Sequence, residues 1–172
     1  RNAKVVYERN FGHHTYSKKQ PVQWSSVYDV ASVTKIAATL PLVMKATEEG
    51  ELSLSDRFKD WFAALRDKPI GEVNLISALS HNARLPAWIP FYKETLDVQQ
   101  QPDRAFYART YSADYPTQVA DSLFLIKDYD SAIFDTIFNV SLESKTYRYS
   151  DLPYYLIAKR LDRRDTPFEE QI

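Results

Sequence analysis

Cysteine is absent from this 172-residue chain, and glycine occurs at only three positions. Without cysteine the chain can form neither a disulfide nor a thiolate metal site. Gly12, Gly50 and Gly71 lie too far apart for a dinucleotide-binding G-x-G-x-x-G turn or a Walker phosphate loop. We therefore expect no nucleotide held by those loops, and we predict no metal or other cofactor.

Long apolar runs and an excess of one charge are also missing. No stretch approaches the about eighteen apolar residues that cross a bilayer, and the first residues lack the apolar core of a signal peptide. The chain has 22 basic and 23 acidic residues, so no net field attracts nucleic acid, and no nucleic-acid partner is expected. The hydrophobic content of 44% suits a single globular domain.

The N-terminal part combines a β pattern with a helical one. A β-prone run that begins at Val5 predicts two strands with a loop over residues 4–28. Apolar positions over residues 36–47 then recur at helical spacing, and Gly50 provides a stop. Pro41 lies inside this helix and is expected to kink it.

The rest of the chain is mostly helical in pattern. A short helix is predicted over residues 58–65, and Asn74 is expected to cap another over Leu75–Ser80. Residues 85–116 are rich in proline and aromatic residues and predict an irregular, ordered segment. Further helices are predicted over residues 119–126, over 133–138 with Asp130 as the cap, over 152–161, and from a capping box at Thr166–Glu169. Because that last helix would barely begin before the sequence ends, we expect a longer parent domain.

Ser32-Val33-Thr34-Lys35 is the first candidate for chemistry. At this spacing a hydroxyl and an amine lie one helical turn apart, so the amine can assist deprotonation of the serine. The positive end of the helix dipole would favour the neutral form of Lys35 and help to hold an oxyanion. The apolar approach Val27–Ala31 is expected to bury this helix start. The alternative is an N-cap serine beside a solvated lysine.

Three landmarks in order carry a family resemblance. The segment Tyr28–Lys35 (YDVASVTK) resembles the first motif of the class C β-lactamase and DD-peptidase group of serine hydrolases. Glu48–Asp56 (EEGELSLSD) resembles that family's EEGKLSLDD stretch, and Leu79–Pro86 (LSHNARLP) resembles its LLTHTSGLP landmark. The resemblance implies an α+β, β-lactamase/transpeptidase-like fold. Residues 1–172 would be part of that domain, with strands and a lead-in over 1–31 and the helical region over 32–172.

The resemblance also implies the roles of the site residues. Ser32 would be the nucleophile, with Lys35 and Tyr149 handling the proton, because Tyr149-Ser150-Asp151 stands at the place of the family's Tyr-x-Asn motif. A tyrosine has an ordinary pKa of about 10 and becomes a base near neutral pH only beside a cation such as Lys35. With twelve tyrosines in the chain, a core role for Tyr149 is the alternative.

Several positions depart from the family pattern. Asp151 stands at a substrate-binding position where the family has asparagine, and an ionised carboxylate can only accept hydrogen bonds. The family's β-lactam turnover is therefore not expected. Ala83-Arg84 replaces Ser-Gly, so the backbone there is expected to avoid positive φ. His81 is interpreted as structural, and the adjacent His13 and His14 find no partner for a metal site.

The family's third motif, Lys-Thr-Gly or His-x-Gly on a later strand, is not found in the sequence. We therefore expect the chain alone to be inactive or nearly so, and the strands over 4–28 to leave an unpaired edge open to self-association. Residues 86–94 resemble a subgroup fused to a glycoside hydrolase family 3 domain, which implies a periplasmic, cell-envelope or secreted protein.

Two functions from different classes fit this sequence. The first is a serine hydrolase that forms an acyl-enzyme on Ser32 and acts on a peptide, amide or ester substrate. The alternative is a non-catalytic module of the same fold that binds cell-wall peptide or carbohydrate through the aromatic residues of 88–115. A third possibility is a fragment whose folding depends on pairing with a second copy.

Overall fold

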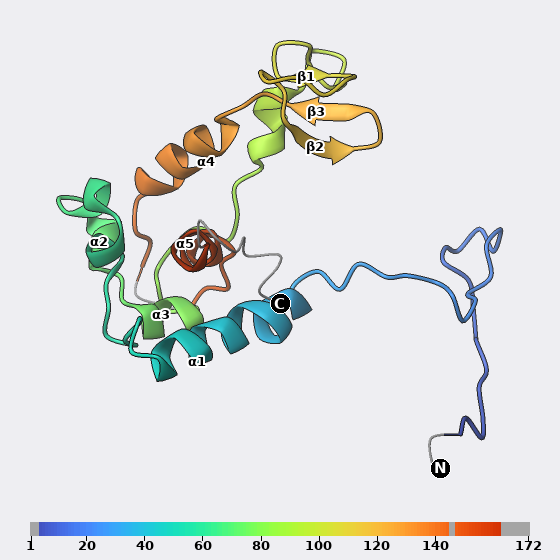
Figure 1. Cartoon of the computed structure of the whole chain (residues 1–172), viewed down its shortest axis with the longest axis horizontal. Helices are drawn as coiled ribbons and strands as arrows, with labels where there is room; N and C mark the ends of the chain where they lie inside the picture. Colours follow the sequence, from blue (N-terminus) through green and yellow to red (C-terminus); the bar gives the residue numbers. More distant parts are fainter. Residues whose placement is uncertain (1–3, 145–146, 163–172) are drawn as a thin grey trace. The chain divides into compact units, whose positions relative to one another are not determined.

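The computed structural model describes residues 4–144 and 147–162, which fall into two compact units, Arg1–Thr34 and Lys35–Ile172 (Figure 1). The capping box predicted at Thr166–Glu169 lies outside the described residues. No helix in the described ranges is long and apolar enough to span a membrane.

The first unit contains no strand among its described residues. Its ordered part is a bend in which an isolated bridge joins His13 and Pro21, and the Val22 amide donates to the Gly12 carbonyl at 3.1 Å. The two strands predicted over residues 4–28 are therefore wrong. Nearly all side chains of this segment are exposed, and an isolated two-stranded hairpin without a packed face is not stable. The sheet edge expected to support self-association is not formed by these residues.

The second unit begins with a π-helix, η1 (Lys35–Thr39), that continues as α1 (Leu40–Glu48). Pro41 is the second residue of α1, where it has no N–H for the Ala37 carbonyl and its ring crowds that group. The wider π turn ahead of Pro41 relieves this crowding, so the predicted irregularity appears as a change of helix type. Gly50, with a φ of 76°, ends α1 as predicted.

Most of the remaining helices are short. They are α2 (Phe58–Trp61), α3 (Leu75–Leu79), α4 (Tyr129–Phe138), α5 (Leu152–Leu161) and the 3-10 turns η2 (Ala63–Leu65), η3 (Pro69–Glu72) and η4 (Phe91–Thr95). The Asn74 side chain accepts the Ser77 amide at 3.0 Å, which confirms the predicted cap of α3. The N-cap of α4 is Asp128 instead of Asp130.

A small antiparallel sheet stands where a helix was expected. Strands β1 (Tyr107–Ala108), β2 (Thr117–Ala120) and β3 (Leu123–Leu125) lie in the order β1-β3-β2. The helix predicted over 119–126 is wrong because Ser122 takes a φ of 51° and turns the chain back into a hairpin. The mixture of helices and one small sheet confirms the α+β class.

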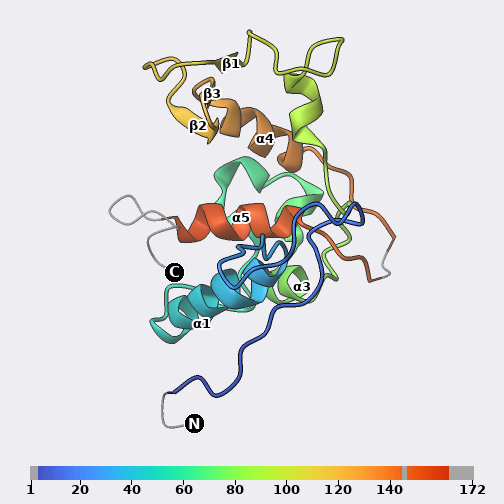
Figure 2. The same ribbon diagram turned by 90° about the vertical axis from the view of Figure 1, so that its right-hand side faces the viewer.

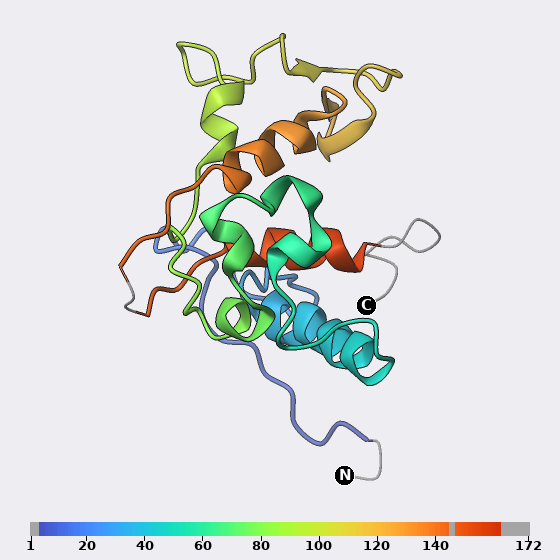
Figure 3. The ribbon, with the colours of Figure 1, turned by 90° about the vertical axis from the view of Figure 1, so that its left-hand side faces the viewer.

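The core of the second unit forms around α5. This helix lies in the middle of the unit, with α1 and α3 on one side and α4 and the sheet on the other (Figures 2 and 3). The fully buried side chains come from helices and from the connections between them: Phe58, Leu65, Ile70, Leu75, Leu85, Ile137, Leu152, Leu156 and Ile157. The helix α5 is thereby packed against α3 and against η1, the element that carries Lys35.

Replacing Gly71 in η3 by alanine should destabilise this core. A Cβ at Gly71 would lie 2.0 Å from the Leu65 carbonyl oxygen, so the backbone has to move. We expect a loss of about 1–3 kcal/mol in the free energy of unfolding, measured by urea denaturation followed by circular dichroism. Glu48→Ala, an exposed change on α1, should stay within about 0.5 kcal/mol. An unchanged midpoint for Gly71→Ala would contradict the packing described.

Candidate active site

Lys35, the first residue of η1, reaches the N-terminus of α5. Its Nζ lies 2.6 Å from Oδ1 of Asp151, and its side chain is only 15% exposed. The same Nζ lies 5.2 Å from the ring centre of Tyr149 and 5.3 Å from that of Tyr154, within the range of cation–π attraction. The structure thus brings together three of the four predicted site residues, Lys35, Tyr149 and Asp151.

The charge state of Lys35 differs from the expectation. Burial alone lowers the pKa of a lysine, but here the contacts with the Asp151 carboxylate and with Tyr149 outweigh burial, so the pKa of Lys35 lies above its usual 10.5. The prediction of a neutral lysine is therefore wrong. Lys35 is an ammonium at neutral pH because its contacts with Asp151 and Tyr149 stabilise the cation more than burial opposes it.

Two tyrosines flank the ammonium, and their surroundings separate their roles. The Tyr154 hydroxyl donates to the Leu79 carbonyl at 3.3 Å, and burial raises the pKa of Tyr154 despite the opposing effect of Lys35. Tyr154 is therefore held as a neutral phenol. Tyr149 is 43% exposed and can meet an incoming substrate. Of the two, Tyr149 is the more accessible, and its predicted role in proton transfer stays a prediction.

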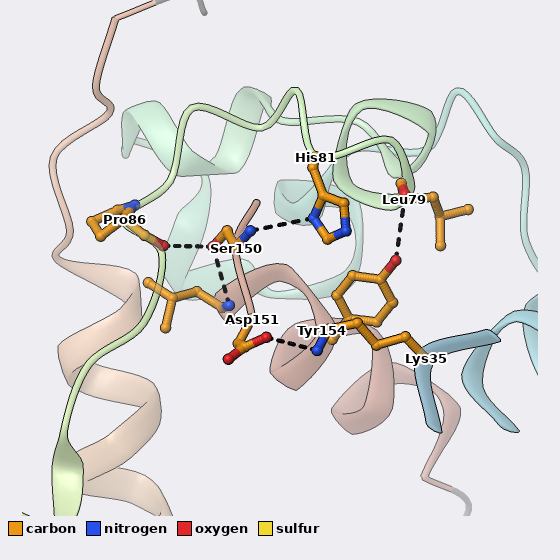
Figure 4. Close-up of polar contacts among 8 residues, drawn as sticks. Lys35, Leu79, His81, Pro86, Ser150, Asp151 and Tyr154 are labelled. Carbon is orange, nitrogen blue, oxygen red and sulfur yellow. Dashed lines mark hydrogen bonds and ion pairs between the residues drawn. The ribbon is translucent and has the colours of Figure 1, made fainter. Parts of the chain in front are cut away.

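The segment that carries Tyr149 and Asp151 is held against the loop after α3. The buried Ser150 donates its hydroxyl to the Pro86 carbonyl at 2.6 Å and its amide to Nδ1 of His81 at 3.3 Å (Figure 4). The Asp151 amide donates to the Ala87 carbonyl at 2.8 Å. The Ser150 hydroxyl also accepts the Leu152 amide at 3.2 Å, which satisfies a free N–H at the start of α5. These bonds fix the start of α5.

Arg84 corrects the expectation for the Ala83-Arg84 pair. Its φ is +60°, so this position keeps the left-handed backbone even without glycine. Two hydrogen bonds hold it there: the Glu143 amide donates to the Arg84 carbonyl at 2.7 Å, and Nε of Arg84 donates to the Glu143 carbonyl at 2.8 Å. A strained backbone persists where surrounding contacts determine it, as here.

Asp151 is the N-cap residue of α5, and its side chain is 42% exposed. The buried oxygen, Oδ1, meets no well-aligned hydrogen-bond donor among the described residues, so its charge depends on the Lys35 ammonium. The rest of the carboxylate is accessible. Asp151 therefore pairs with Lys35 through one oxygen and leaves part of its carboxylate accessible.

Ser32 belongs to the other compact unit, so its place beside Lys35 is a prediction from the sequence. It lies in a turn formed by the Asp29 carboxylate, which accepts the Ala31 amide at 2.7 Å, and by the positive φ of Ala31. Ser32 is exposed, and so are Val27 and Val30. Within its own unit the apolar approach packs against no core, and the burial of this helix start stays a prediction.

Sequence reasoning missed the contribution of His81 and Ser150 to this site. Both lie within recognised motifs, but their contacts join segments far apart in the chain, and no spacing rule predicts such a pairing. Within residues 4–144 and 147–162, no group of three or more His, Asp or Glu side chains could hold a metal ion.

Asp151→Asn should lower the pKa of Lys35, because it removes the anion that stabilises the ammonium. The titration is followed by NMR of the lysine side-chain carbons. Asp114→Asn provides the matched control, since Asp114 lies 3.0 Å from Lys127 and raises the pKa of that lysine. It should shift Lys127 and leave Lys35 unchanged. An unaltered Lys35 titration in Asp151→Asn would contradict the ion pair.

A family model described as Beta-lactamase matches residues 1–172. A crystal structure of a class C β-lactamase from Rhodobacter sphaeroides is similar in fold, with a TM-score of 0.54 and 23% identity. The match covers 88% of this chain and 34% of that one, so this chain spans about a third of the length of that protein. No curated protein gives a match. By the family match over its whole length, the chain belongs to the β-lactamase family.

Proposed function

We propose that this chain carries the nucleophile and proton-transfer groups of a serine hydrolase that forms an acyl-enzyme on Ser32. Membership of the β-lactamase family supports a serine-hydrolase-like function. The assignment of the proton-transfer groups rests on the contact between Lys35 and Tyr149, in which an ammonium lies beside a partly exposed phenol. Of the two tyrosines beside Lys35, Tyr149 is the accessible one, and we assign it as the proton acceptor.

In the proposed reaction, the Tyr149 phenolate takes the proton of the Ser32 hydroxyl as Oγ attacks the substrate carbonyl carbon. The carbonyl π electrons move to oxygen and form the tetrahedral intermediate. When they return, the bond to the leaving group breaks, and Tyr149 gives its proton to the departing nitrogen or oxygen. Water then attacks the acyl carbon while Tyr149 accepts a proton from it. The bond from the acyl carbon to Oγ breaks, the acid leaves, and Tyr149 returns the proton to Oγ of Ser32. Lys35 remains an ammonium throughout and lies beside the ring of Tyr149.

Asp151 supports a peptide or amide substrate, which offers an N–H, over a β-lactam. The asparagine usual at this position can donate to a substrate carbonyl, whereas an ionised carboxylate can only accept. With one oxygen beside Lys35 and the rest of the group accessible, Asp151 can accept the N–H of a peptide-like substrate. A substrate that offers only acceptors to this position would bind less well.

A second candidate is a binding module without turnover. Trp88, Tyr92 and Tyr111 are 57%, 55% and 68% exposed, and such aromatic side chains can stack on sugar rings or contact peptides. Saturable binding of a cell-wall peptide or oligosaccharide, lost in Trp88→Ala and unaffected by Ser32→Ala, would favour this function. Such binding without any covalent adduct on Ser32 would decide for the binding module over the hydrolase.

Incubation with an activated p-nitrophenyl ester should leave one acyl group on Ser32. Without a Lys-Thr-Gly or His-x-Gly motif in the sequence, we expect acylation about 10² to 10³ times slower than in a site with a second oxyanion donor. Intact-mass spectrometry over a long time course follows the adduct, and peptide mapping locates it.

Ser32→Ala should abolish the adduct, whereas Ser25→Ala, an exposed serine of the same unit, should not change its rate. Acylation that persists in Ser32→Ala, or that maps to another residue, would refute the nucleophile. A rapid burst of acylation on Ser32 would instead refute the expected slow rate.

A further inference from the structure

His81 has a backbone conformation that usually selects glycine. It follows the C-cap of α3 with a φ of +58°. The Asn82 amide donates to the Ser77 carbonyl at 2.8 Å and the His81 amide to the Ala78 carbonyl at 3.3 Å, which together form a Schellman motif. A residue with a side chain is strained at this position. The contacts of the imidazole therefore need an explanation beyond helix termination.

Those contacts enclose Tyr149 on both sides. The Arg148 amide donates to the His81 carbonyl at 3.0 Å, and the Ser150 amide donates to Nδ1 of the His81 ring at 3.3 Å. Between these two bonds the ring of Tyr149 lies on the imidazole, with centroids 4.2 Å apart. Figure 4 shows the imidazole directed at Ser150 from the loop that follows Leu79. One residue thus holds the backbone before and after Tyr149, and its ring as well.

We propose that His81 is a positioning residue that holds Tyr149 for proton transfer, and that it does so only as a neutral imidazole. The inference rests on the proposed function, because it assigns His81 to the proton acceptor of that reaction. It differs from the structural role predicted from the sequence, since a residue that only ended α3 would not make the reaction depend on the protonation of its ring.

The chemistry of the ring gives this dependence a direction. Nδ1 accepts the Ser150 amide, so the proton of the neutral ring is on Nε2, and a second proton on Nδ1 breaks the bond. Burial, and then the positive charge of Lys35, hold the pKa of His81 below its usual 6.5. The groups that face the ring from η1, from the Tyr149 segment and from α5 are Lys35, Tyr147, Tyr149, Asp151 and Tyr154.

The same shift links pH to stability. The unfolded chain takes up the proton near pH 6.5, before the folded chain does. The unfolded state therefore binds more protons as the pH falls below that value, and stability decreases with it. As the pH falls, stability therefore begins to decrease first, and the bond from Ser150 to the His81 ring breaks only at the lower pKa of the folded chain.

The test uses a full-length chain in which His13→Asn and His14→Asn leave His81 as the only histidine. In this background His81→Asn keeps an acceptor, Oδ1, at the position of Nδ1, and asparagine tolerates the positive φ. His81→Gly also tolerates the backbone but lacks both the acceptor and the ring. Thermal unfolding verifies that both variants fold.

Two measurements decide the proposal. Acylation by the p-nitrophenyl ester should be about 10- to 100-fold slower in His81→Gly, as expected for a misplaced proton acceptor, and within about threefold of the background in His81→Asn. In the background chain the rate should fall more steeply once the pH drops below the pKa of His81, and this extra fall should disappear in His81→Asn. By NMR, the Ser150 amide should shift with the titration of His81.

A folded His81→Gly chain that is acylated at the background rate would overturn the proposal, as would an extra acid fall that persists in His81→Asn. A Ser150 amide that does not follow the imidazole would also overturn it. If the background chain is not acylated on Ser32 at all, the proposed function fails. The NMR titration then decides by itself whether His81 holds the Tyr149 segment.

Discussion

A largely buried lysine ammonium needs an anion close by, and the second unit is arranged around this requirement. Lys35 opens η1, and the anion is supplied by Asp151 at the N-terminus of α5. The ion pair joins two elements that are distant in sequence, and the rings of Tyr149 and Tyr154 lie beside the same charge. Removing one partner would leave a poorly solvated charge, so the pair and the packing of α5 depend on each other.

The loop after α3 supports this arrangement from the other side. Its carbonyls and the His81 ring accept hydrogen bonds from the backbone of residues 148–151, while left-handed conformations at His81 and Arg84 turn the loop toward that backbone. Strained residues of this kind persist where surrounding contacts determine them. In this chain they lie within Leu79–Pro86, the segment that resembles a landmark of the β-lactamase family.

Local rules predicted the elements whose determinants lie within a few residues. Asn74 caps α3, Gly50 ends α1, and the apolar pattern over 152–161 matches α5. The rules failed where tertiary contacts decide. The β-prone start finds no sheet to join, and the segment around Ser122 turns back as a hairpin. The same holds for the candidate site. Short motifs predicted Lys35, Tyr149 and Asp151 as its residues, but the charge of Lys35 depends on a carboxylate far along the chain, which no local rule predicts.

In the proposed reaction, Lys35 and Tyr149 act together in one proton-transfer step. A double-mutant cycle with Lys35→Met and Tyr149→Phe, measured as the rate of Ser32 acylation, tests it most directly. If the ammonium acts through the phenolate, either change removes the shared step, and the double variant should be no slower than the slower single variant. Rate losses that multiply in the double variant would show that Lys35 and Tyr149 act independently and would contradict a shared proton-transfer step.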